Sequence, residues 1–165
     1  MPILDPNSLE FISRSTEHTR RVGMRLGALL NAGDVVCLVG DLGSGKTTFV
    51  QGIAAGWGSL DRVTSPTFVL VNVYRRPEGG RLFHLDAYRL SSAAEAEDLD
   101  VQPMLESGPL VVEWAERVQP VLPRYHLWVT MQLISMGQRD MVFTGHGNRY
   151  LSLMAAFRKQ LYGGQ

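Results

Sequence analysis

Apolar residues follow two kinds of pattern along the chain. Continuous runs and alternation with polar residues predict strands, and recurrence every three to four residues predicts helices. Continuous apolar runs at Val35–Val39 and within 108–114 (GPLVVEW) predict short strands buried on both faces. Five further strands are predicted where apolar and polar residues alternate or where an apolar segment is bounded by turn residues. These are 9–13 (LEFIS), a hairpin of 67–74 and 81–86 around RPEGG, and a hairpin of 125–134 and 139–145 around SMGQ.

Helical spacing fills the intervals between the predicted strands. After a Ser15 N-cap, Val22, Leu26, Leu29 and Leu30 lie on one helical face, and Gly33 is the expected C-cap. Further helices are predicted at 46–55, at the acidic segment 91–99, at 101–107, and from an Asn148 cap to 161.

The order of these elements predicts the fold class. We expect an α/β fold, a P-loop NTPase-like three-layer domain with a mixed, partly antiparallel sheet flanked by helices. Its length of 165 residues suits a single domain over 1–165.

Composition narrows the possible functions. Lys+Arg 16 balance Asp+Glu 16, so the basic excess typical of a direct nucleic-acid binder is absent. The single cysteine, Cys37, excludes an intramolecular disulfide framework and is predicted to be a core residue. No apolar run has the roughly 20 residues of a membrane span, and the first residues do not resemble a signal peptide. We therefore expect a cytoplasmic protein that does not associate with membranes.

The segment between the first buried strand and the next helix carries the clearest chemistry. Gly40, Gly45, Lys46 and Thr47 fit G-x-x-x-x-G-K-[ST] with a strand before and a helix after. In such a loop, backbone N–H groups and the helix N-terminus surround a phosphate, the lysine contacts the β- and γ-phosphates, and the hydroxyl binds Mg²⁺. The predicted nucleotide contacts are Gly40, Asp41, Leu42, Gly43, Ser44, Gly45, Lys46, Thr47 and Thr48.

Two carboxylates stand at the ends of predicted strands. Glu113 ends the second buried run, and Asp86 ends the strand RLFHLD. Either could be a solvated or capping carboxylate, but two acids at two strand ends favour a functional pair in which one could bind the metal while the other orients water. His84 and Trp114 stand beside these acids and are expected to serve packing more often than chemistry.

Other features bear on how the nucleotide is used. The loop TSPT at 64–67 is either an ordinary turn or a segment that senses the γ-phosphate. The patterns D-x-x-G and N-K-x-D are absent, which disfavours GTP. No arginine finger is fixed by a motif, and Arg89 and Arg117 are only candidates.

Four motifs in order, GDLGSGKTTF, SPTF, HLDAYRL and EW, resemble the bacterial TsaE (YjeE) ATPases. The resemblance extends from Gly40 to Trp114, and VLP at 121–123 fits it as well. It implies an Mg²⁺-dependent ATPase that works with the TsaB and TsaD proteins, and the absence of a motif-fixed arginine finger predicts that the isolated chain hydrolyses ATP slowly. TsaB and TsaD make threonylcarbamoyladenosine at adenosine 37 of tRNAs that read codons beginning with A, so tRNA would be contacted only through the complex.

The same resemblance assigns roles to individual residues. It implies that Thr47 and Glu113 bind Mg²⁺, that Lys46 holds the phosphates, and that Asp86 assists hydrolysis. It also aligns Thr16 and Gly137 with nucleotide contacts of the family. Lys46 and Asp86 are thus the expected catalytic residues, and ATP and Mg²⁺ the expected cofactors.

Two other classes of function remain open from the residues. A P-loop small-molecule or nucleoside kinase would suit the length and the motif, with Arg75, Arg76 and Arg81 as a possible anion clamp. These arginines fall on a predicted hairpin, which counts against a lid. A nucleotide-gated binding module without useful turnover is the third class.

Overall fold

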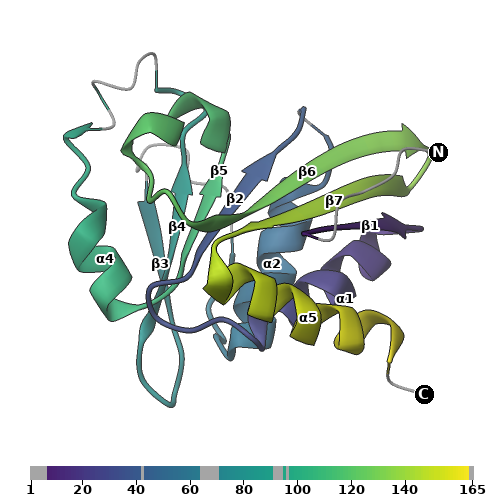
Figure 1. Cartoon of the computed structure of the whole chain (residues 1–165), viewed down its shortest axis with the longest axis horizontal. Coiled ribbons are helices and arrows are strands. Elements are labelled where there is room, and N and C mark those ends of the chain that lie inside the picture. The colour runs from purple at the N-terminus through teal and green to yellow at the C-terminus, as the bar shows by residue number, and fades with distance from the viewer. Residues whose placement is uncertain (1–6, 42, 64–70, 91–94, 96, 164–165) are drawn as a thin grey trace.

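The structure is a computed structural model that describes residues 7–41, 43–63, 71–90, 95 and 97–163. Element labels follow Figure 1. The strands are β1 (Ser8–Ser13), β2 (Val35–Val39), β3 (Val71–Arg75), β4 (Arg81–Asp86), β5 (Leu110–Glu113), β6 (His126–Ser135) and β7 (Gln138–His146). The helices are α1 (Thr16–Gly27), α2 (Lys46–Trp57), α4 (Val101–Ser107) and α5 (Asn148–Tyr162), with 3₁₀ turns η1 (Ala115–Arg117) and η2 (Gln119–Val121).

In the described part of the chain the strands form one seven-stranded mixed sheet, in the order β1-β7-β6-β2-β5-β4-β3. The four central strands β6, β2, β5 and β4 are parallel, while β1, β7 and β3 pair antiparallel at the two sides. The strand β2 therefore lies between two parallel neighbours, β5 and β6. The segment that follows β2 emerges at the carboxyl edge of the sheet, where α/β proteins place their ligands.

Two hydrophobic cores lie on opposite faces of the sheet, as the predicted three-layer architecture requires. Helices α1, α2 and α5 cover one face (Figure 1), where Val36 and Leu38 of β2 are buried. On the other face Val35 and Cys37 of β2 are buried among residues of β4, β5 and the 3₁₀ turns, with α4 packed at the margin. Because alternate residues of β2 enter both cores, the predicted doubly buried strand and the core position of Cys37 are confirmed.

Helices α1 and α2 approach each other unusually closely through glycines. Gly23 and Gly27 of α1 face Gly52 and Gly56 of α2 across the contact. A Cβ atom at Gly27 would lie 2.0 Å from the carbonyl oxygen of Ile53. Only glycine permits this backbone contact, which fixes the position of α2, the helix that follows the phosphate-binding motif.

Most predicted boundaries are confirmed, and two caps are wrong. The hydroxyl of Ser15 accepts a hydrogen bond from the His18 amide, as expected for an N-cap. The helix nevertheless ends at Gly27 and not near Gly33, because the Asp34 carboxylate accepts the Asn31 amide at 2.7 Å and holds a turn there.

The expected Asn148 cap is displaced by one residue. Gly147 is the N-cap of α5, with φ 100°, and Asn148 is the first helical residue. A Cβ at Gly147 would lie 2.7 Å from the Tyr125 ring, so the close approach of that ring also favours glycine. The helix predicted at 46–55 extends two residues further, to Trp57, where Gly58 provides a left-handed C-cap.

Some predicted features fall outside the described residues. They include TSPT at 64–67, the first part of the strand 67–74, and most of the acidic helix 91–99. Among the helices in the described part of the chain, none has the length and apolar character that a membrane crossing requires.

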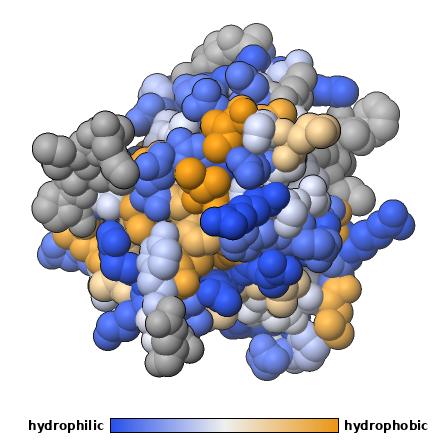
Figure 2. All heavy atoms as spheres, turned by 90° about the vertical axis from the view of Figure 1, so that its right-hand side faces the viewer, coloured by the Kyte–Doolittle hydropathy of each residue, from blue (hydrophilic) through white to orange (hydrophobic). Residues whose placement is uncertain are grey.

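The turn between β6 and β7 presents apolar side chains to solvent. Leu133, Ile134 and Met136 are exposed there, Met136 almost fully, and Ile12 of β1 is exposed on the neighbouring strand. This end of the hairpin lies at the right of Figure 1 and therefore points toward the viewer in Figure 2. Figure 2 shows apolar patches between polar side chains on that face.

Candidate functional site

The loop between β2 and α2 is folded as the motif predicts. Gly43 and Gly45 have φ values of 81° and 99°, in the left-handed region, and Lys46 begins α2 directly after Gly45. A Cβ at Gly40 would lie 2.4 Å from the Met131 carbonyl oxygen, so this position also requires glycine. The loop therefore curls over the N-terminus of α2, the end of a helix that attracts an anion. Leu42 lies outside the described residues.

The ammonium group of Lys46 lies inside the loop. Nζ donates to the carbonyl oxygens of Gly40 and Asp41, the latter at 3.0 Å, and lies 4.3 Å from the centre of the Trp114 ring. Burial lowers the pKa of Lys46, while nearby carboxylates, of which Glu113 has the largest effect, oppose this change. The cation is thus held beside the loop with few competing water contacts, where a phosphate would meet it.

The two predicted carboxylates are neighbours. Glu113 and Asp86 are register partners at the ends of the parallel strands β5 and β4. Glu113 also pairs with Leu38 of β2, two residues before the loop begins, and its side chain is buried. Asp86 is half-buried, and burial raises its pKa despite the hydrogen bond that its Oδ1 accepts from the Tyr88 amide at 2.9 Å.

A buried chain of hydrogen bonds orients the Glu113 carboxylate. His84 Nε2 lies 2.5 Å from Glu113 Oε2, and His84 Nδ1 lies 2.8 Å from the Tyr74 hydroxyl. All three side chains are buried, and both histidine nitrogens are engaged. His84, expected to serve packing, thus has a second role: it fixes one oxygen of Glu113 and leaves the other to bind a ligand.

Trp114 follows Glu113 in a strained backbone conformation. With φ 58° it is the only non-glycine residue of the described chain with positive φ, which is rare for a bulky side chain. This conformation places its ring beneath the Lys46 ammonium and against Tyr88, at 4.9 Å between ring centres. Arg117 donates to the Tyr88 carbonyl oxygen and stacks near both rings.

The two contacts implied only by resemblance lie near each other. Thr16 is the first residue of α1, and Gly137, at the β6–β7 turn, packs against Arg14 and Ser15 just before it. The start of α1 and the hairpin turn therefore lie together at the carboxyl edge of the sheet, the edge from which the loop emerges.

Sequence reasoning missed Arg139, which the structure places next to Gly45. Its Nε lies 3.0 Å from the position that a Cβ of Gly45 would occupy. The alternation along β7 could have indicated it. Residues two apart in a strand point to the same face, so Arg139 shares the face of the buried Met141 and Phe143.

A metal site of the P-loop type fits the donors on these elements. The Glu113 carboxylate and the Thr47 hydroxyl are hard oxygen ligands of the kind that Mg²⁺ prefers, and Mg²⁺ takes its remaining ligands from water and phosphate. Within the described residues there is no group of three or more His, Cys, Asp or Glu side chains that could hold a metal alone.

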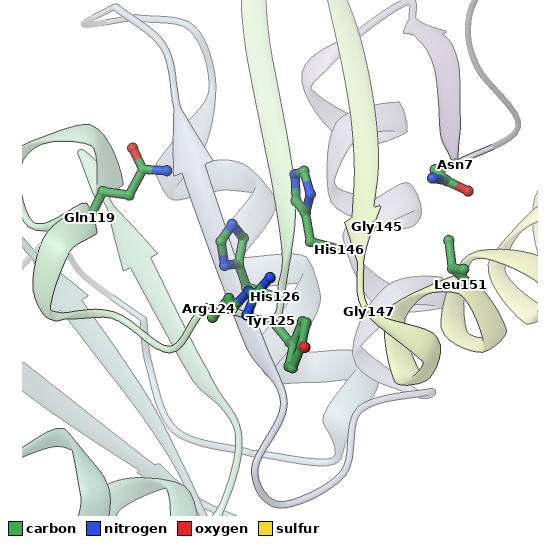
Figure 3. Close-up of a pocket in the computed structure, with 9 residues that line it drawn as sticks. All are labelled: Asn7, Gln119, Arg124, Tyr125, His126, Gly145, His146, Gly147 and Leu151. Atoms are coloured by element: carbon green, nitrogen blue, oxygen red, sulfur yellow. The ribbon is translucent and has the colours of Figure 1, made fainter.

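A separate cavity of about 440 Å³ (Figure 3) lies far from the loop, at the opposite ends of the parallel strands. It is lined by His126 and His146, whose ring centres are 5.0 Å apart, and by Arg124 among others. Since β6 begins at His126 and runs parallel to β2, this cavity lies at the end of the sheet opposite the loop. None of the predicted site residues lines it.

The mixed sheet, the glycine loop on α2 and the adjacent strand-end carboxylates define an α/β protein of the P-loop class. The family model for the threonylcarbamoyl adenosine biosynthesis protein TsaE matches residues 13–141. The protein named tRNA threonylcarbamoyladenosine biosynthesis protein TsaE from Treponema pallidum is 42% identical over 132 residues, covering 78% of this chain and 95% of the relative. The TsaE protein of Bacillus subtilis is 36% identical over 144 residues, covering 86% and 89%.

A solved structure agrees with these matches. The crystal structure of Bacillus subtilis YdiB superimposes with a TM-score of 0.77 at 30% identity and covers 93% of this chain and 95% of that one. The chain belongs to the TsaE family of threonylcarbamoyladenosine biosynthesis proteins.

Proposed function

We propose that this chain binds Mg²⁺–ATP at the loop between β2 and α2 and hydrolyses it. We further propose that the hydrolysis supports a TsaB–TsaD complex that threonylcarbamoylates adenosine 37 of tRNAs reading codons that begin with A. The observation that carries the proposal is the position of the Lys46 ammonium, inside a curled glycine loop and beside the buried Glu113 carboxylate.

Each site residue has a part in this proposal. The loop amides and the Lys46 ammonium would bind the β- and γ-phosphates. Thr47 and Glu113 would hold Mg²⁺, which when bound neutralises charge on the phosphate oxygens. Asp86 would orient the attacking water or accept its proton, and its raised pKa makes it a stronger base than an exposed aspartate.

The proposed dependence on partners has two supports besides the family. The formal net charge is +0, which suits a protein that reaches tRNA through a complex and not by itself. The exposed Ile134 and Met136 beside Gly137 offer an apolar surface next to the site, as protein–protein contacts often do.

The alternative of a kinase lid is disfavoured by one contact. Arg76, in the β3–β4 turn, stacks on Trp57 at 4.1 Å and donates to the Trp57 and Gly79 carbonyl oxygens. An arginine held in this way by its own turn and by the end of α2 has a structural role, and no described contact directs it toward the loop.

Replacement of Lys46 tests the proposal, and the chain offers a matched control because its other lysine, Lys159, is exposed on α5. Calorimetric titration with Mg²⁺–ATP is expected to show a Kd raised about 10- to 100-fold for Lys46→Ala, the usual effect of losing a charged hydrogen-bond donor. Lys159→Ala should bind as the wild type does. An unchanged Kd in Lys46→Ala would refute nucleotide binding at this loop.

Turnover tests the rest of the proposal. ADP release without an added acceptor is expected to be slow for the chain alone and to change when TsaB and TsaD are added. Full turnover that saturating TsaB–TsaD leaves unaltered would contradict the coupling, and turnover only with a phosphate acceptor would support a kinase.

A further inference from the structure

The side chain of Arg139 is placed unusually for a cation in a sheet. It lies on the face of β7 that α1, α2 and α5 cover, and its Nε is buried. That Nε makes no hydrogen bond with any residue of the described chain. A buried N–H of a guanidinium is costly to leave without an acceptor, so such a group points to an acceptor that the described residues do not supply.

The position of Arg139 indicates what that acceptor is. Its Nε and Cδ are the nearest atoms to the Cβ position of Gly45, at 3.0 and 3.5 Å. Gly45 is the residue before Lys46, at the point where the phosphate-binding loop enters α2. The guanidinium stem therefore lies along the loop, within reach of an anion bound there.

The topology separates two sides of the loop. On one side β5 and β4 bring Glu113 and Asp86, the proposed metal and hydrolysis residues. On the other side β6, β7 and the start of α1 bring Arg139, Gly137 and Thr16. A triphosphate lying across the loop would direct its γ-phosphate to the first side, with the metal, and the phosphates nearer the nucleoside to the second side.

We propose that Arg139 is a nucleotide-binding residue that donates to the α-phosphate from the β7 side of the loop. This inference rests on the proposed function. A guanidinium suits the role because its donors form a planar fork that matches phosphate oxygens. Arg139 makes no ion pair among the described residues, so its charge is available for such a contact. It is not an arginine finger, because it lies on the side away from Glu113 and Asp86.

This assignment predicts a specific kinetic pattern. A contact to the α-phosphate, which takes no part in the bond that breaks, is present in ATP, in ADP and in the transition state alike, so its loss weakens binding without slowing chemistry. Arg139→Gln is expected to raise the Kd of ADP and of ATP by the same factor, about 10- to 100-fold, with kcat at saturating ATP unchanged. A finger would instead lower kcat and leave ADP binding nearly intact.

The experiment is a titration of the full chain with Mg²⁺–ADP and Mg²⁺–ATP, followed by turnover with TsaB and TsaD at saturating ATP. Arg139→Lys, which keeps the charge but loses the fork, should give an intermediate Kd, and it provides a second readout if Arg139→Gln folds poorly. Arg21→Gln, at an exposed arginine of α1, is the control and should match the wild type.

The outcomes distinguish this inference from the proposed function. Equal losses of ADP and ATP affinity support the role of Arg139. Wild-type ADP affinity in Arg139→Gln, or a fall confined to kcat, overturns it while leaving the ATPase proposal intact. Failure of the wild type to bind either nucleotide refutes the proposed function itself, and the inference with it.

Discussion

Gly27→Ala tests whether the backbones of α1 and α2 touch. Judged as a helical residue alone, alanine at this position should stabilise the protein by about 1 kcal/mol over glycine. The structure predicts the opposite, because the new Cβ would lie 2.0 Å from the Ile53 carbonyl oxygen and 2.8 Å from the Ile53 carbonyl carbon.

The size of the effect follows from how far the helices must move. Cβ atoms are essentially never closer than 3.0 Å to such a neighbour, so α1 and α2 would have to separate locally by about 1 Å. That movement would loosen the contacts of Leu26, Phe49 and Ile53, all fully buried. Overpacking of a core costs about 1–3 kcal/mol, and a rigid backbone obstacle places this case at the upper end. After the helix gain is subtracted, we expect a net loss of about 2 kcal/mol.

Thermal and urea unfolding followed by circular dichroism measure this loss directly. About 2 kcal/mol corresponds to a fall in Tm of about 4–8 °C for a chain of this size. The matched control is Ala55→Gly, on the exposed side of α2, where only helix propensity acts and a loss of about 1 kcal/mol is expected. If Gly27→Ala were instead about 1 kcal/mol more stable than the wild type, the close approach of the two helices would be refuted.

Two further predictions concern the site and the core. Glu113→Ala should weaken the Mg²⁺ dependence of ATP binding, whereas Asp86→Ala should lower turnover more than ATP affinity. Identical defects in Mg²⁺ titrations of the two variants would show that the roles are not divided in this way. Burial raises the pKa of Cys37 to about 12, so its thiol should resist alkylation at pH 8.5 in the native protein and react only after unfolding. Rapid modification of the native chain, followed by mass spectrometry, would contradict that burial.

The features that could be predicted from the sequence were local ones. The strand, loop and helix around Lys46 could be predicted from a short continuous segment of the sequence. The apolar run before Glu113 likewise indicates the end of a buried strand, which the structure places next to β2. Asp86 and Glu113 could be proposed as neighbours because parallel strands end at one edge of a sheet.

The features that could not be predicted depend on segments far apart in the chain. Arg139 reaches Gly45 only through the order of β7, β6 and β2, which periodicity does not disclose. The facing glycines of α1 and α2 look unfavourable to helices when each is considered alone, and only their contact explains them. The early end of α1 depends on the Asp34 carboxylate, whose competition with the helix has no signal in the apolar pattern.

The pairing of β1 with β7 has a consequence for the order of folding. The hydrogen bond between the Ser8 and Thr144 hydroxyls joins residues 136 positions apart, so on a ribosome β1 would wait on the order of 10 s for its partner to be synthesised. Helices α1 and α2 are close in sequence and can pack long before that. Pulse-labelled hydrogen exchange during refolding should therefore show β1 amides protected after those of α2, and simultaneous protection would contradict this order. Until β7 arrives, the β1 segment remains an unpaired strand with exposed backbone donors and acceptors, which a chaperone could protect from pairing with another chain.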